Sequence, residues 1–397
     1  MLRLKSSPGS IPCPPRIGSL ATPERGQDIR YRWRYVRAPE HSSRTEGVED
    51  ALNERLQVTE VRRAEIQSLP PNEAMSILAP DACGTIRVPP LTIAIGNYGL
   101  TKPLKDGSVH SDLKFEYIQV DPIVAAMRRM VRGLEFDICE MALTTYLCAK
   151  AYGKPITAIP LFLTRNFHHW AIFYNVSSGI KKPKDLEGRT VAVNRGYTVT
   201  TGLWARGILQ TEYGVDLNKI TWAPTDDEHV AEYKAPANVD YSLRGKPMAE
   251  LLLSGKIAAA VGDVRVNSPE IQQLIPDARN AGFAYFQKTG VYPINHGLVV
   301  KDSVLQAAPV LACELFRAFQ GAKKIYLAHL EAGKDLSSAD ETAIALRRVV
   351  GDPFPFGIKG SNGKALETIV QFAVDQQVIP KKFGIEELFA PGALNLE

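Results

Sequence analysis

The chain of 397 residues is 45% hydrophobic and 23% charged, with a formal net charge of +4. These values are ordinary for a globular protein, and the length allows two domains or one two-lobed unit. The positive charge is small and scattered without interleaved aromatic residues, which argues against nucleic acid as a partner. No segment has the length and apolar character of a transmembrane helix, so we expect no membrane partner.

The cysteines are widely spaced and include no CxxC pair, which predicts neither a zinc site nor a disulfide framework. The first 30 residues lack the apolar core of a signal peptide. Both features predict a cytoplasmic protein with reduced thiols. No glycine-rich phosphate loop is present, and we expect no cofactor and no metal. Whether the chain forms a homo-oligomer stays open.

Residues 1–87 differ from the rest because they are rich in Arg, Pro, Glu and Ser. A segment of this composition buries too little apolar surface to offset its ordering entropy. We therefore expect a largely disordered N-terminal extension, with one charged helical candidate at 48–67. Met75 opens the run that leads into the first strand, and we expect it to be an alternative start of the functional chain.

From residue 88 onward, short apolar runs alternate with amphipathic segments, which predicts an α/β fold. We expect strands at 91–95, 115–120, from 136, 157–162, 170–174, 190–193, 220–223 and 258–261, with a crossing segment at 291–300. We expect helices at 122–131, 198–213, 247–254, 309–332, 338–350 and 364–377. Asp121 is the expected N-cap of the first helix.

A polar link at 181–188 and a return near 285–296 predict two lobes joined by two crossings. We expect residues 88–180 to begin lobe 1, residues 181–290 to form lobe 2, and residues 291–397 to return to lobe 1. Ligands of such folds lie between the lobes, at loops that follow strand ends.

The most informative stretch runs from 136 to 175, where two apolar runs flank a loop containing Arg165, His168 and His169. Functional groups concentrate on loops held by buried strands. The competing interpretation is that both imidazoles are structural, because histidine is commonly half-buried without a role. Glu140 interrupts the apolar segment upstream. Adjacent histidines do not share a face of a strand, which disfavours a metal site.

Several motifs resemble the bacterial 4,5-dihydroxyphthalate decarboxylase family over residues 90–395. They are Gly96-Asn-Tyr98, Phe136-Asp-Ile-Cys-Glu-Met141, Arg165-x-Phe-x-His169, Trp204-x-Arg-Gly207, Pro293-x-x-His296 and Asp352-Pro-Phe-Pro-Phe-Gly357. The resemblance implies a two-lobed fold similar to type 2 periplasmic solute-binding proteins. It also implies non-oxidative loss of CO2 from an aromatic diacid, most simply 4,5-dihydroxyphthalate to protocatechuate. His168 and Trp170 depart from the family pattern, which allows a related aromatic acid as substrate.

The implied chemistry needs proton transfer and cations for carboxylates. Imidazoles titrate near neutral pH and guanidinium groups bind carboxylates in a bidentate manner. The expected catalytic residues are His169, His296 and Glu140. The expected binding residues for the aromatic carboxylate are Arg165, Arg206, Asn97, Tyr98 and Thr198. Arg206 has a structural alternative as a helix-surface ion pair.

Two other classes remain open from the sequence. One is a solute-binding protein of a transporter for aromatic acids or sulfonates, which would require export. The other is a biosynthetic enzyme of the same fold, such as a menaquinone-pathway dehydratase or a thiamine-pyrimidine synthase. The latter would carry a cysteine-rich motif, which is missing in this sequence.

Overall fold

The computed structural model describes residues 90–397. The expected extension at 1–87, its helical candidate and Met75 lie outside the described residues. None of the helices in the described part combines the length and apolar composition that a membrane span requires.

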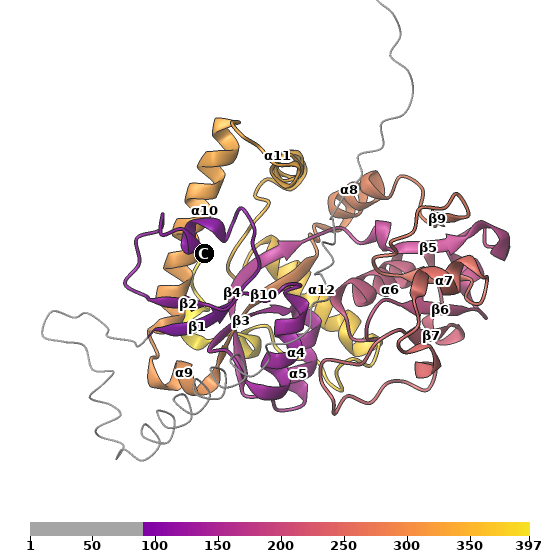
Figure 1. Ribbon diagram of the computed structural model, residues 1–397, viewed down its shortest axis with the longest axis horizontal. Helices are drawn as coiled ribbons and strands as arrows, with labels where there is room; N and C mark the ends of the chain where they lie inside the picture. Colours follow the sequence, from indigo (N-terminus) through magenta and orange to yellow (C-terminus); the bar gives the residue numbers. More distant parts are fainter. Residues whose placement is uncertain (1–89) are drawn as a thin grey trace, which may run out of the picture. The chain divides into compact units, whose positions relative to one another are not determined.

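The first of two five-stranded sheets has the order β2-β1-β3-β10-β4 (Figure 1). Strands β1, β2 and β3 are parallel, whereas β10 is antiparallel to both β3 and β4. The bounds are β1 (Leu91–Ala94), β2 (Phe115–Tyr117), β3 (Ile138–Ala142), β4 (Ile156–Arg165) and β10 (Ile294–Lys301).

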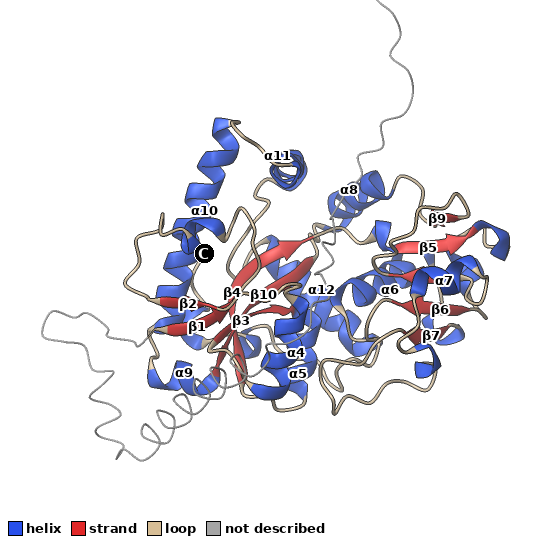
Figure 2. Ribbon diagram, in the orientation of Figure 1, coloured by secondary structure: helices blue, strands red, loops and turns tan. Residues whose placement is uncertain are grey.

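The second sheet repeats this plan with the order β7-β6-β8-β5-β9 (Figure 2). Strand β6 is parallel to β7 and β8, and β5 is antiparallel to β8 and β9. The bounds are β5 (Ile172–Asn175), β6 (Thr190–Val193), β7 (Thr221–Pro224), β8 (Ala259–Val261) and β9 (Ile271–Gln273). Both sheets are mixed, and their strand orders correspond. This arrangement confirms the expected α/β fold with two lobes of the type 2 periplasmic-binding-protein kind.

Helices cover both faces of each sheet. The central strands of both sheets carry apolar side chains on their two faces, and both faces must be buried. One face of the first sheet packs on α10 (Leu311–Ala332) in a core that includes Ile93, Leu298 and Phe319. The opposite face shares a core with the second lobe. The helices of that core are α4 (Val124–Gly133), α5 (Leu143–Ala151), α6 (Thr200–Tyr213) and α12 (Ser361–Asp375).

The outer face of the second sheet packs on α7 (Met248–Leu253) through Ala192, Ala260 and Leu252. The remaining helices are short or lie outside these layers. They are α3 (Lys102–Lys105), α8 (Ala278–Thr289), α9 (Asp302–Ala307) and α11 (Ser338–Val350).

The first crossing between the sheets lies earlier than expected. Strand β4 ends at Arg165 and β5, which begins at Ile172, already belongs to the second sheet. The boundary expected at residue 181 is therefore wrong. The error arose because the apolar run 170–174 carries no sign of which sheet it joins. The return passes through the residues between α8 and β10, close to the expected position.

The expected N-cap of α4 is also wrong, since α4 begins at Val124 with Ile123 in the cap position and no side-chain cap. Burial of Met127, Met130 and Val131 sets the helix position here. Local capping preference is weaker than such packing.

Candidate functional site

The central residue of the candidate site is Glu140, whose side chain on β3 is completely buried. Its carboxylate accepts three hydrogen bonds. The backbone N–H of Gly96 donates to Oε2 at 2.8 Å, and the hydroxyl of Tyr98 donates to Oε1 at 2.8 Å. Nδ1 of His296 lies 2.7 Å from Oε1. A buried carboxylate persists only with such partners, so these three donors define the site.

His296 lies at the start of β10, where this antiparallel strand meets the carboxyl end of β3. Its side chain is 18% exposed, in contrast to the fully buried Glu140. Because Nδ1 donates to the carboxylate, the neutral ring presents an unprotonated Nε2. This Nε2 has no hydrogen-bond partner among residues 90–397. It is therefore available to exchange a proton with a ligand.

Tyr98 follows β1 and completes the set from the loop 95–101. Burial and the neighbouring Glu140 raise the pKa of its phenol well above the usual value, so the hydroxyl stays protonated and donates. The loop requires glycine at Gly96, because a Cβ there would lie 2.4 Å from the Tyr98 ring. The motif Gly96-Asn-Tyr98 thus serves close packing and the hydrogen bonds to Glu140.

Sequence reasoning missed Lys105, which lies on α3 directly behind this loop. Its Nζ donates to the carbonyl of Ile95 at 2.8 Å and to Oδ1 of Asn97 at 2.6 Å. Burial lowers the pKa of Lys105, and the charge of Glu140 opposes that shift. Lys105 therefore orients Asn97 and places a positive charge near the buried carboxylate. The spacing of eight residues from Asn97 gave no helical or strand signal to reveal this contact.

His169 and His168 are both fully buried on the first crossing. Nε2 of His169 lies 2.9 Å from Oε2 of Glu212 on α6, and Nε2 of His168 lies 2.7 Å from Oδ1 of Asn295. Burial lowers the pKa of His169, against the opposing effect of Glu212. Burial lowers the pKa of His168 to about 3. His169 therefore lies in a separate cluster, with no hydrogen bond to Glu140.

Arg165 is engaged by the protein itself. Nη1 donates to the carbonyl of Tyr292 at 2.8 Å, and Nη2 donates to the carbonyl of Pro355 at 3.3 Å and to Oδ1 of Asn362. Burial lowers its pKa to about 10. The guanidinium thus ties β4 to the segment 352–357, which contains the rigid Pro-Phe-Pro-Phe motif.

Arg206 is fully buried in α6, so its alternative as a surface ion pair is wrong. Nε donates to Oε1 of Gln376 at 2.7 Å and Nη2 to the carbonyl of Tyr197 at 2.8 Å. The guanidinium carbon lies 3.9 Å from the centre of the Tyr197 ring. The sequence did not predict that Arg206 is buried, because apolar Trp204 on the same helix was the more obvious residue to pack inside.

Thr198 precedes α6, and its polar groups bond to a second buried carboxylate, that of Glu228. The backbone N–H and Oγ1 of Thr198 donate to Oε2 of Glu228 at 3.1 and 2.7 Å, and the N–H of Tyr197 donates to Oε1 at 2.6 Å. Glu228 therefore satisfies the amides of the two residues that precede the N-cap Val199 of α6. The carbonyl of Thr198 also accepts from Thr144 of the first lobe at 2.6 Å.

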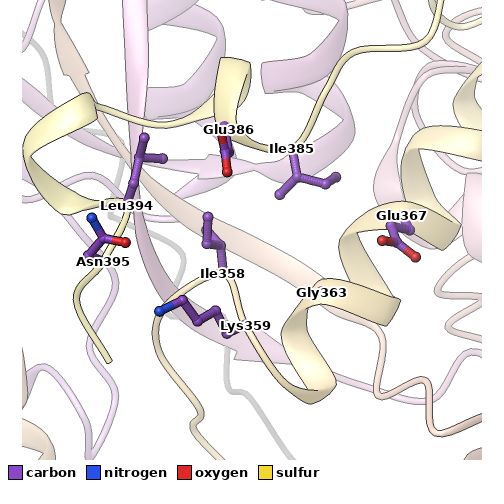
Figure 3. Close-up of a pocket in the computed structure, with 8 residues that line it drawn as sticks. All are labelled: Ile358, Lys359, Gly363, Glu367, Ile385, Glu386, Leu394 and Asn395. Atoms are coloured by element: carbon purple, nitrogen blue, oxygen red, sulfur yellow. The ribbon is translucent and has the colours of Figure 1, made fainter.

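A pocket of about 340 Å³ lies elsewhere, between the start of α12 and the C-terminal segment (Figure 3). It is lined by Ile358, Lys359, Gly363, Glu367, Ile385, Glu386, Leu394 and Asn395. None of the expected site residues lines it. Within residues 90–397, no three His, Cys, Asp or Glu side chains are arranged to hold a metal ion.

The family described as NMT1/THI5 like matches residues 135–329. A protein of Comamonas testosteroni named 4,5-dihydroxyphthalate decarboxylase is 28% identical over 332 residues, covering 77% of this chain and 97% of the relative. A Pseudomonas putida protein of the same name is 29% identical and covers 50% of this chain and 81% of the relative. The expected resemblance to the 4,5-dihydroxyphthalate decarboxylases is confirmed.

Among solved structures, the periplasmic aliphatic sulphonate binding protein SsuA of Escherichia coli is 13% identical, with a TM-score of 0.45. The match covers 77% of this chain and 99% of that protein. The NMT1/THI5-like match at residues 135–329 includes both Glu140 and His296.

Proposed function

We propose that this protein is a carboxy-lyase that removes CO2 from a hydroxylated aromatic diacid, with 4,5-dihydroxyphthalate as substrate and protocatechuate as product. The names of its relatives support the reaction class. The observation that carries the proposal is the Tyr98–Glu140–His296 set, in which a partly exposed imidazole is oriented by a buried carboxylate.

The reaction requires one proton to replace one CO2. In 4,5-dihydroxyphthalate each hydroxyl is para to a carboxylate. Loss of the phenolic proton moves electron density to the carboxylate-bearing carbon, which is then protonated to give a dienone. The bond to the carboxylate breaks, its electron pair restores the aromatic ring, and CO2 leaves. The phenolate is finally reprotonated, so each turnover consumes one proton.

His296 has the chemistry for this proton transfer, because Nε2 is available while Nδ1 is held by Glu140. Glu140 keeps the imidazole in one tautomer and stabilises the imidazolium when a proton is bound. The proposal also retains His169 as a second proton-handling residue. It retains Asn97, Tyr98 and Thr198 as binding residues, together with Arg165 and Arg206. Most donors of both guanidinium groups already bond to the protein, and one buried nitrogen of each, Arg165 Nε and Arg206 Nη1, has no partner among the described residues.

The proposal is tested by incubating the purified protein with 4,5-dihydroxyphthalate and measuring CO2 and protocatechuate. In deuterated water the product should carry one deuterium at the carbon that lost the carboxylate. Tight binding of the diacid without release of CO2 would instead favour the transport-protein class. Turnover of a related hydroxylated diacid alone would keep the reaction and change the substrate.

A further inference from the structure

We infer that Arg195 binds a carboxylate of the aromatic ligand, an assignment that rests on the proposed function and extends it. Arg195 lies in the loop between β6 and α6, just beyond the carboxyl end of a central parallel strand. Ligands of open α/β sheets bind outside such strand ends. The equivalent loop of the first lobe, after β1, supplies Gly96 and Tyr98 to the Glu140 set.

The backbone at Arg195 is in a conformation that this residue type avoids. Its φ is +68°, in the left-handed region that favours glycine. Three hydrogen bonds hold it there. The N–H of Arg195 donates to Oγ1 of Thr225 at 3.1 Å, and its carbonyl accepts from the N–H groups of Thr225 and Asp226 at 3.0 and 3.3 Å. Such conformations are costly, and they concentrate at functional sites.

The guanidinium of Arg195 has no hydrogen-bond or ion-pair partner among the residues that the structure describes, and the residue is partly buried. Burial lowers its pKa, and the charges of Asp263 and Asp226 oppose that shift. Both are already engaged by other arginines. Arg265 bonds to Asp263 at 2.8 Å, and Arg128 bonds to Asp226 at 3.0 Å.

This leaves Arg195 as a partly buried cation whose planar donors have no partner among the described residues. A carboxylate that binds a guanidinium through two parallel hydrogen bonds suits such a group. Arg165 and Arg206 differ, because each already donates at least two hydrogen bonds to carbonyl and amide oxygens of the protein, which leaves one buried nitrogen of each unpaired. Placing arginine where glycine is the easier choice is consistent with a requirement for its charge.

The test uses phthalate as the probe, since it carries both carboxylates and lacks the hydroxyls needed for decarboxylation. Binding is measured by calorimetry, and thermal unfolding is measured without ligand, for the full chain and three variants. Arg195→Ala and Arg195→Gly both remove the cation, but only Gly relieves the left-handed backbone. Arg279→Gln removes an exposed arginine on α8 that pairs with neither aspartate, and it serves as the control.

We expect Arg195→Ala and Arg195→Gly to weaken phthalate binding by about 10- to 100-fold, the loss for charged hydrogen bonds. We expect Arg195→Gly to melt a few degrees above Arg195→Ala, and Arg279→Gln to bind phthalate as the wild type does. Unchanged affinity in both Arg195 variants overturns the assignment, as does a wild type that does not bind phthalate. Arg195-dependent binding without turnover of 4,5-dihydroxyphthalate would refute the proposed function and leave the assignment standing.

Discussion

Nδ1 of His296 lies 2.7 Å from Oε1 of Glu140, although the two residues are not paired in the sheet. On the antiparallel strands β3 and β10, Glu140 is opposite Leu298 and His296 is opposite Ala142. The two side chains are therefore diagonal neighbours on one face, within the range over which long side chains interact. Because β3 and β10 are neighbouring inner strands of the first sheet, the register between them fixes the pair.

Replacing His296 by Gln should lower turnover by ~10²–10⁴-fold, the usual contribution of a general acid or base. Ligand binding should persist, because Gln retains a polar side chain of similar reach. The measurement is turnover per folded molecule, with the exposed His110→Gln as the control. Normal turnover would remove His296 from the reaction. The same measurement on His169→Gln tests whether that buried residue also handles a proton.

Replacing Lys105 by Met should lower kcat/KM by about tenfold, the scale of one hydrogen bond to a charged group. The loss of its bonds to Ile95 and Asn97 frees the loop that presents Gly96 and Tyr98 to Glu140. Lys102→Met is the matched control, because Lys102 is exposed on the same short helix. Equal kcat/KM values for the two variants would contradict a positioning role for Lys105.

Replacing Arg165 by Lys should lower the free energy of unfolding by ~2 kcal/mol, because a single ammonium cannot keep all three acceptors. Urea unfolding measures this loss, and Arg348→Lys on the exposed face of α11 is the control. Unchanged stability combined with weaker phthalate binding would show that Arg165 contacts the ligand directly.

Stability should fall as the pH is lowered from about 6.5, the ordinary histidine value, toward 4. His168 has a pKa of about 3 in the folded protein, so between 3 and 6.5 the unfolded chain binds more protons and unfolding is favoured. His229, with a pKa of about 4, acts in the same direction. Melting temperatures of the wild type, His168→Gln and His110→Gln between pH 7 and 4 measure the effect.

His168→Gln should show a flatter pH dependence than the wild type, whereas exposed His110→Gln should follow the wild type. A wild-type melting temperature that stays constant down to pH 4 would mean that His168 is not held neutral by burial.

Local sequence signals predicted the fold best where one face of an element is apolar or its ends are capped. The strand at Thr190–Val193 and the helix at Ser338–Val350 have the predicted bounds, and a Ser337–Asp340 capping box starts the latter. Helix α5, in contrast, is buried on nearly all sides and has no amphipathic period, so it was not predicted. Helix α8 was missed as well, because its mixed composition has only a weak period.

The candidate site was also predicted only in part from the sequence. The residues Tyr98, Glu140 and His296 were named from loops, apolar context and family motifs, and the fold brings them into hydrogen-bond contact. The burial of Arg165 and Arg206 depends on carbonyl and amide groups far away in the chain, which no local pattern encodes. Lys105 was missed for another reason, because its partners Ile95 and Asn97 are near in the chain but outside any helix or strand that could set a period.

The central claim is that Glu140 orients His296 for proton transfer in decarboxylation. It is tested most directly by the rate of CO2 release from 4,5-dihydroxyphthalate, compared between the wild type and Glu140→Gln. Gln keeps the size of the side chain and removes the charge that holds the imidazole. We expect the wild type to release CO2, and the variant to be folded and slower by ~10²-fold or more. Equal rates in both, or no release by the wild type, would contradict the account.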